Sequence, residues 1–183
     1  IMPSLVGSEM CIRDSHKGGD KNNDLFLTEV MVRPIDSGPE WIEIYNPNDF
    51  ALSLYGWSLN HTYASTSNNL LFKEGIISGH STIILSGDAS SQDSGNASQV
   101  FDLSQESFLG VGSINLLNDG QGELTLRYTQ LNSVKSYDVM DVKWGGSSNL
   151  FTSLGQSLEA DQINGGFSAN WSVQSNPTPG DYL

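Results

Sequence analysis

The feature that most constrains this chain is a series of short apolar runs with the two-residue alternation of β-strands. In the segment 40–46, Trp41, Glu43 and Tyr45 share one face, and two isoleucines occupy the other. Similar runs recur between turns rich in Gly, Asn, Asp and Ser, and residues that favour helices are scarce in any continuous stretch. The pattern therefore predicts an all-β domain.

The spacing of these runs predicts about seven to nine strands without intervening helices, which is typical of a β-sandwich or barrel. We expect strands at residues 25–32, 40–46, 52–59, 81–86, 113–117 and 123–128, and a further strand pair within 134–144. Shorter apolar runs at 70–72 and 76–77 flank Gly75. Surface loops are expected at 60–69 and 87–98, a short helical turn or irregular cover at 101–109, and a loop-rich remainder at 145–183.

Four residues are expected to serve the structure of the domain. Gly56 precedes Trp57 and predicts a bend that lets this ring pack inward. Leu158 and Trp171 are the expected anchors of the loop-rich remainder, and both tryptophans are expected in the core rather than in a binding surface.

Charge argues against one class of partner. The 183 residues include 8 basic and 21 acidic side chains, and the net charge of -13 disfavours direct contact with nucleic acid. Cys11 is the only cysteine, so the sequence forms no intrachain disulfide. It also contains no apolar run of about 18 residues, so we expect no membrane span.

The organisation of the chain has three parts. Residues 1–15 look like translated sequencing-adapter DNA at the edge of a metagenomic contig, and we expect them to be non-native. Residues 16–24 are polar and without periodicity, as a linker is, and residues 25–183 are expected to form one domain.

Seven motifs in order give the chain a resemblance to the lamin tail domain, an immunoglobulin-like family. They are Thr28–Val30, Glu40–Pro47, Leu52–Leu59, Gly79 with Thr82–Leu85, Asn118–Gly120 with Glu123–Leu126, Asp141–Trp144, and a closing segment with Gly155–Glu159, Trp171 and Thr178–Gly180. The resemblance implies an immunoglobulin-like β-sandwich that makes contacts. Prokaryotic members commonly accompany secreted nucleases, phosphoesterases or other surface hydrolases.

Candidate ligand-binding residues fall in two places. Trp41, Glu43 and Tyr45 could form a solvent-facing patch that contacts protein or stacks on a glycan, and core packing is the alternative. Asp88, Asp93 and Asn96 offer oxygen ligands for calcium within a loop, although no cofactor is required.

No residues form a recognisable catalytic group. His61 and His80 are expected on turns and lack the neighbours of a zinc motif, so we expect no enzyme activity. The predicted function is a non-catalytic binding, adhesion or scaffolding module of a secreted or cell-surface protein, with protein or glycan as partner. The alternatives are an accessory C-terminal domain of a secreted hydrolase, a nuclease or phosphoesterase whose catalytic part lies outside this sequence, and a structural spacer.

Overall fold

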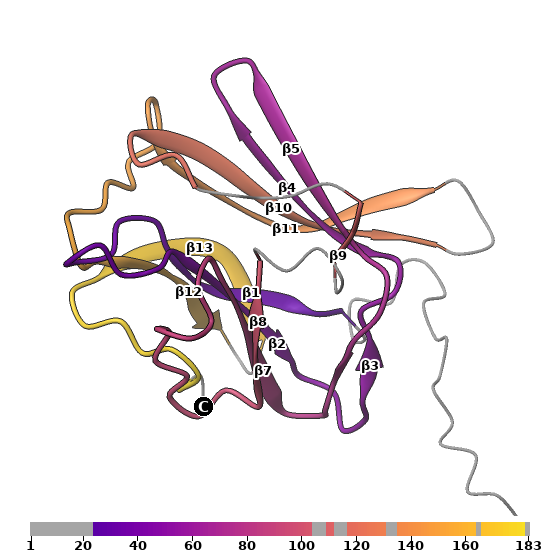
Figure 1. The fold of residues 1–183 in the computed structure, drawn as a ribbon. Coiled ribbons are helices and arrows are strands. Elements are labelled where there is room, and N and C mark those ends of the chain that lie inside the picture. Colours follow the sequence, from indigo (N-terminus) through magenta and orange to yellow (C-terminus); the bar gives the residue numbers. More distant parts are fainter. Residues whose placement is uncertain (1–23, 104–108, 112–116, 131–134, 164–165, 182–183) are drawn as a thin grey trace, which may run out of the picture.

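The computed structural model describes residues 24–103, 109–111, 117–130, 135–163 and 166–181. These residues form thirteen strands and no α-helix, which confirms the predicted all-β class. The strands make a six-stranded sheet, a five-stranded sheet and a two-stranded ribbon (Figure 1). The two larger sheets form a sandwich, as an immunoglobulin-like domain does, although the strands outnumber the seven to nine expected.

The six-stranded sheet has the order β13-β12-β1-β2-β7-β8. Its strands are β1 (Phe26–Met31), β2 (Trp41–Asn46), β7 (Ser81–Ser86), β8 (Gln99–Asp102), β12 (Ser157–Ile163) and β13 (Gly166–Gln174). All neighbours pair antiparallel except β7 and β8, which are parallel. Strands from both ends of the described sequence therefore lie side by side in this sheet.

The five-stranded sheet has the order β11-β10-β4-β5-β9, and β3 pairs with β6 in the ribbon. The bounds are β3 (Leu52–Ser53), β4 (Trp57–Tyr63), β5 (Thr66–Phe72), β6 (Ile76–Ile77), β9 (Leu109–Val111), β10 (Gln121–Thr129) and β11 (Ser136–Gly145). Figure 1 shows the β4–β5 hairpin projecting from one end of the sandwich.

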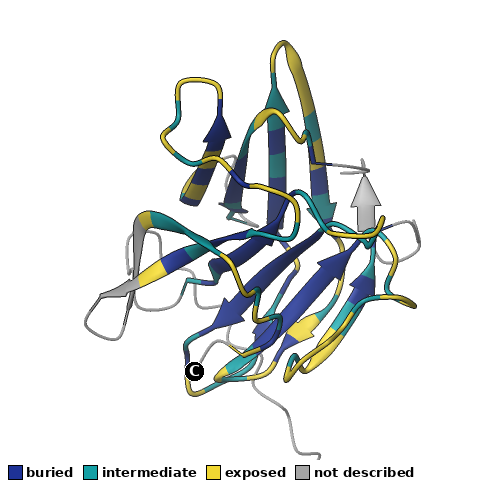
Figure 2. Cartoon of the chain, turned by 90° about the vertical axis from the view of Figure 1, so that its left-hand side faces the viewer, coloured by how far each residue is buried: buried dark blue, intermediate teal, exposed yellow. Residues whose placement is uncertain are grey.

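One large apolar core lies between the sheets, where burial of the side chains stabilises the fold (Figure 2). Leu27 and Ile44 enter it from the six-stranded sheet, and Leu59 and Leu126 enter it from the five-stranded sheet, all without exposed surface. The predicted bend at Gly56 is present, with φ of 89°, a conformation that favours glycine. Trp57 is buried in this core as expected.

The outer face of the six-stranded sheet is also covered. Met31, Trp41 and Ile84 form a second buried cluster there, against which Ala97 and Val100 pack. Residues 87–98 contain no strand, which confirms the loop predicted there. Ala97 belongs to this loop, so the loop lies over the outer face of the sheet. The sheet is therefore buried on both faces around its centre.

Three expected segments differ from the structure. Residues 60–63 and 66–69 are paired in the β4–β5 hairpin, where a loop was expected, because their polar side chains stand on strands that satisfy each other's backbone groups. Residues 101–102 lie in β8 instead of a helical turn. Residues 145–183 contain β12 and β13, and the expected strand at 113–117 lies almost wholly outside the described residues.

Candidate functional site

The predicted solvent-facing patch on β2 is buried, so the expectation of an exposed surface there is wrong. Trp41, Glu43 and Tyr45 do share one face of the strand, but they are only 4%, 0% and 8% exposed. The covering loop 87–98 and the segment 178–181 come from distant parts of the sequence, which is why local alternation suggested a surface. Trp41 accordingly packs on apolar neighbours inside the domain.

Beneath this cover, three glutamates stand side by side on adjacent strands. The strand register pairs Glu29 of β1 with Glu43 of β2 on one side and with Glu159 of β12 on the other. Glu29 and Glu43 have no exposed surface. Burial is the largest cause that raises the pKa of each from 4.5 to about 7.

Both buried carboxyl groups accept hydrogen bonds from the segment 178–181. The backbone N–H of Gly180 donates to Glu43 Oε2 over 2.6 Å, and that of Thr178 donates to the two Glu29 oxygens over 3.2 and 3.3 Å. The Thr28 hydroxyl donates to Glu43 Oε1, and the Ser157 hydroxyl donates to Glu29 Oε1, which also accepts the Thr178 N–H. The row of acids therefore holds this segment against the sheet.

The three residues predicted as calcium ligands each take part in hydrogen bonds of their own. Asp88 accepts hydrogen bonds from Ser90 and Ser91, and these bonds lower its pKa. Asp93 accepts the N–H of Gly95, and Asn96 donates to Asp181. Within the described ranges, no three His, Cys, Asp or Glu side chains are grouped to hold a metal ion. Asp88 and Asp93 shape the loop 87–98 through these bonds, and Asn96 joins the same loop to Asp181.

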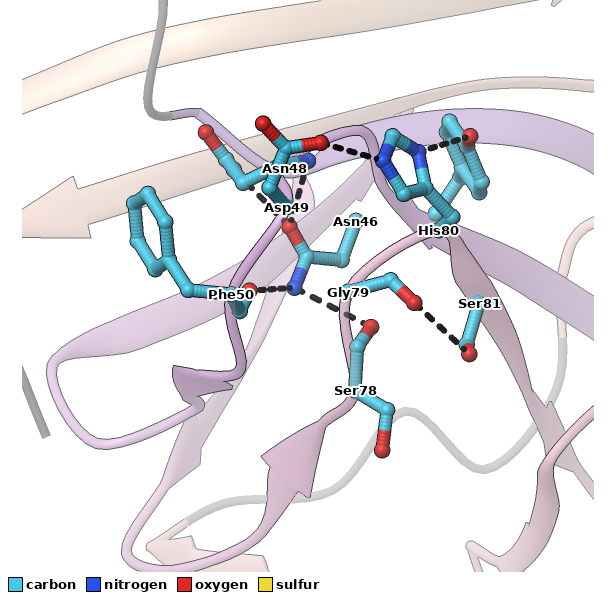
Figure 3. Close-up of polar contacts among 9 residues, drawn as sticks. Asn46, Asn48, Asp49, Phe50, Ser78, Gly79, His80 and Ser81 are labelled. Carbon is cyan, nitrogen blue, oxygen red and sulfur yellow. Dashed lines mark hydrogen bonds and ion pairs between the residues drawn. The ribbon is translucent and has the colours of Figure 1, made fainter. Parts of the chain in front are cut away.

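Asn46, at the end of β2, is a buried residue at the centre of a turn (Figure 3). Its Nδ2 lies 2.8, 3.0 and 3.1 Å from the carbonyl oxygens of Phe50, Ile77 and Ser78. Its Oδ1 accepts both the backbone and the side-chain N–H of Asn48, and a Cβ at Gly79 would lie 2.6 Å from the Asn48 oxygen. Asn46 thus joins the loop after β2 to the end of β6 and the turn that follows it.

Of the two histidines expected on turns, His80 lies in one and His61 does not. His80 does lie in a turn, where its Nε2 is 2.7 Å from Asp49 Oδ1 (Figure 3). His61 lies within β4 without exposed surface. Its ring stacks on that of Trp144 with 5.7 Å between the ring centroids, and its centroid lies 5.1 Å from that of Tyr63. Neither ring nitrogen of His61 has a hydrogen-bond partner, and burial lowers its pKa, so this ring packs as a neutral aromatic.

A hollow of ≈ 380 Å³ opens beside these rings. It is lined by the ends of β4, β10 and β11 and the turn after β11: Thr62, Tyr63, Ala64, Gln121, Gly122, Glu123 and residues 143–148. Lys143 Nζ lies 3.1 Å from Glu123 Oε1 and 3.8 Å from Asp141 Oδ2, and both carboxylates raise the lysine pKa. Hydroxyl, amide and aromatic groups thus lie around the ion pairs of Lys143 with Glu123 and Asp141.

A second hollow of ≈ 460 Å³ shares Lys143 and Ser148 with the first. Its other lining residues are Asp141, Leu150, Asn170 and Trp171. Trp171 is half-buried, packs against the core and donates its ring N–H to the carbonyl of Asp141. It therefore lines the hollow in addition to its expected structural role. Leu158, the other expected anchor, is fully buried in the core.

An exposed apolar patch lies on two loops elsewhere. Ile35, Phe151 and Leu154 are 60%, 61% and 63% exposed. The loops are joined because Gly155 N donates to the carbonyl of Arg33 over 2.7 Å, and Arg33 Nη1 donates to Thr152. We call Ile35, Phe151 and Leu154 the apolar patch. No sequence signal marked it, because isolated apolar residues in loops are ordinary.

The sandwich defines a domain of immunoglobulin-like type, whose surface offers hollows and an apolar patch for contacts. Comparison with known families places it further: the model of the Lamin Tail Domain matches residues 19–140, which is more than half of the chain. The chain belongs to the lamin tail domain family, whose members are generally non-catalytic binding or structural modules. A search of curated proteins found no match. Among the described residues, no helix could span a membrane.

Proposed function

We propose that this domain is a non-catalytic recognition module of a secreted or cell-surface protein, and that it binds glycan at the two adjoining hollows. The observation that carries the proposal is the lining of the first hollow, where Tyr63 stands beside hydroxyl and amide groups. Aromatic faces bind the apolar faces of sugars, and a few convergent polar groups orient the hydroxyls.

The charges of the site favour a neutral ligand. Lys143 is engaged by Glu123 and Asp141, which leaves no free cation in the floor of the hollow. The net charge of -13 repels anionic ligands from the whole surface. Neutral oligosaccharides therefore fit this site better than phosphorylated or sulfated ones.

A glycan array with the whole chain tests the proposal. Wild type should bind a set of neutral oligosaccharides, and Tyr63→Ala should weaken that binding at least about tenfold through loss of the stacking surface. Tyr137→Ala is the matched control, because Tyr137 is 36% exposed on β11 and lines neither hollow. No binding by wild type, or equal binding by wild type and Tyr63→Ala, would refute the glycan site.

The apolar patch supports a second candidate, a protein partner. Large exposed apolar side chains gathered on joined loops are typical of surfaces that contact proteins. Ile35→Ser, Phe151→Ser and Leu154→Ser together should abolish capture of a cell-surface protein that wild type retains, without change in the unfolding midpoint. Capture that persists in the triple variant would exclude the patch as the contact.

The complete reading frame bears on the two alternatives. An accessory role in a secreted hydrolase predicts a nuclease or phosphoesterase domain in the same protein. A structural spacer predicts neighbouring domains of similar type and no ligand in either binding assay. An export signal in that frame would support the extracellular setting.

A further inference from the structure

We propose that residues Thr178–Asp181 form a pH-dependent latch on the outer face of the six-stranded sheet, held by the carboxyl groups of Glu29 and Glu43. This inference goes beyond the proposed function and does not depend on it. It rests on a different part of the molecule from the hollows and the apolar patch.

The latch has a defined set of contacts. The backbone N–H groups of Thr178 and Gly180 donate to Glu29 and Glu43 respectively, so two residues of the segment are bonded to two neighbouring strands. Gly180 is buried. Its φ of 79° and the nearness of Ala97 N and Ser94 O leave no room for a side chain.

The latch also holds the covering loop. Asn96 donates to Asp181, and a Cβ on Gly95 would overlap the carbonyl oxygen of Pro179. Ala97 of the same loop packs on the cluster that contains Trp41. Release of the latch would therefore loosen the loop and expose the apolar outer face.

The charged groups nearest to the pair are acidic. Glu43 and Glu159 raise the pKa of Glu29, and Glu159 and Asp181 raise that of Glu43. The other titratable groups on the covered face, beside it or on its loop are Tyr45, His80, Asp49, Asp88, Asp93, Asp102 and Asp161. Among the described residues, no Lys, Arg or His contributes to either pKa. The hydrogen bonds to the two glutamates lower both pKa values, but burial outweighs them, so ionisation of both glutamates places two charges in a buried site beneath the latch.

The sign of the pH effect follows from proton linkage. The pKa of each glutamate is about 7 with the latch closed and 4.5 in water, so the closed form binds more protons. The closed form is fully favoured below pH 4.5, and opening becomes easier as pH rises to about 7. A shift of this size allows up to about 300-fold change in the opening equilibrium for each carboxyl group.

Amide hydrogen exchange of the whole chain between pH 5 and pH 8, corrected for intrinsic exchange rates, measures this opening. The protection factors of Thr178 and Gly180 should fall at least about tenfold over this range. These protection factors should also stay below those of the β10 amides at each pH, because the latch opens without unfolding of the whole domain. Protection that does not change with pH, or that equals the protection of β10, would overturn the latch.

Variants separate the carboxyl groups from other causes. Glu29→Gln with Glu43→Gln keeps an acceptor oxygen at each position and should make latch protection independent of pH. Glu74→Gln, a change of the same type at an exposed site, should retain the wild-type fall. If the double variant does not fold, carbon-detected titration of the wild-type glutamates still decides: two midpoints near neutral pH support the latch, and two near 4.5 overturn it.

Discussion

Replacement of Asn46 tests whether the turn after β2 is held by one buried amide. In Asn46→Ala the carbonyl oxygens of Phe50, Ile77 and Ser78 lose the donor that now lies within 2.8 to 3.1 Å, and the N–H groups of Asn48 lose their acceptor. Because Asn46 has no exposed surface, water cannot replace these bonds without opening the turn.

The magnitude follows from the number of groups left without partners. The Asn46 amide has two N–H donors shared among three carbonyls, so we count two donor bonds and two acceptor bonds. At about 1 kcal/mol for each bond, Asn46→Ala should lower the free energy of unfolding by about 4 kcal/mol. Asn46→Asp has the same shape but points a carboxylate at three carbonyls, so at pH 7 it should be at least as destabilising.

Urea unfolding monitored by tryptophan fluorescence measures both variants. Asn60→Ala is the control, because the Asn60 side chain bonds to exposed Ser67 in its hairpin, and it should change stability by less than about 0.5 kcal/mol. A loss below about 1 kcal/mol in Asn46→Ala would show that the backbone holds the turn without the amide, and would refute this reasoning.

Three further predictions concern single sites. Burial raises the pKa of Glu40 to about 7, so the folded state favours its protonated form. Glu40→Gln should therefore raise the urea midpoint at pH 8 and leave it unchanged at pH 4.5. Equal changes of the midpoint at the two pH values would contradict this. Gly95→Ala should lower the free energy of unfolding by about 2 to 4 kcal/mol, because its Cβ would overlap the Pro179 carbonyl. Gly120→Ala, whose Cβ would have its nearest contact at 3.6 Å, should lower it by less than about 1 kcal/mol in the same urea unfolding assay. Calcium or a chelator should leave the thermal midpoint unchanged, since Asp88 and Asp93 are bonded within the loop 87–98. A rise of the midpoint with calcium would contradict this and support the metal site.

The strands that could be predicted are those whose own residues define two faces or a buried run. Segments 40–46 and 81–86 carry alternating or continuous apolar residues, and β2 and β7 occupy nearly the same bounds. The β4–β5 hairpin was missed because residues 60–69 are mostly polar, and their extended form depends on hydrogen bonds between two strands. Strand β12 was missed for a related reason: it pairs with β1, more than a hundred residues away.

The candidate site was harder to predict because its cover is non-local. Alternation placed Trp41, Glu43 and Tyr45 on one face correctly, but the segments that bury this face begin more than forty residues further on. Gly95 and Gly180 were the available signal, since each stands where another backbone approaches too closely for a side chain. A sequence cannot reveal that these two glycines face each other's segments.

The motif Glu40–Pro47 therefore combines two structural tasks in one strand. Glu43 accepts the N–H of Gly180, and Asn46 joins the loop before β3 to the end of β6 and the turn that follows it. An apolar side chain at position 43 would avoid the cost of a buried carboxyl, but it would leave the Gly180 N–H without an acceptor. The acid thus determines where the Thr178–Asp181 segment lies, and its cost in stability at neutral pH is what makes that position sensitive to protons.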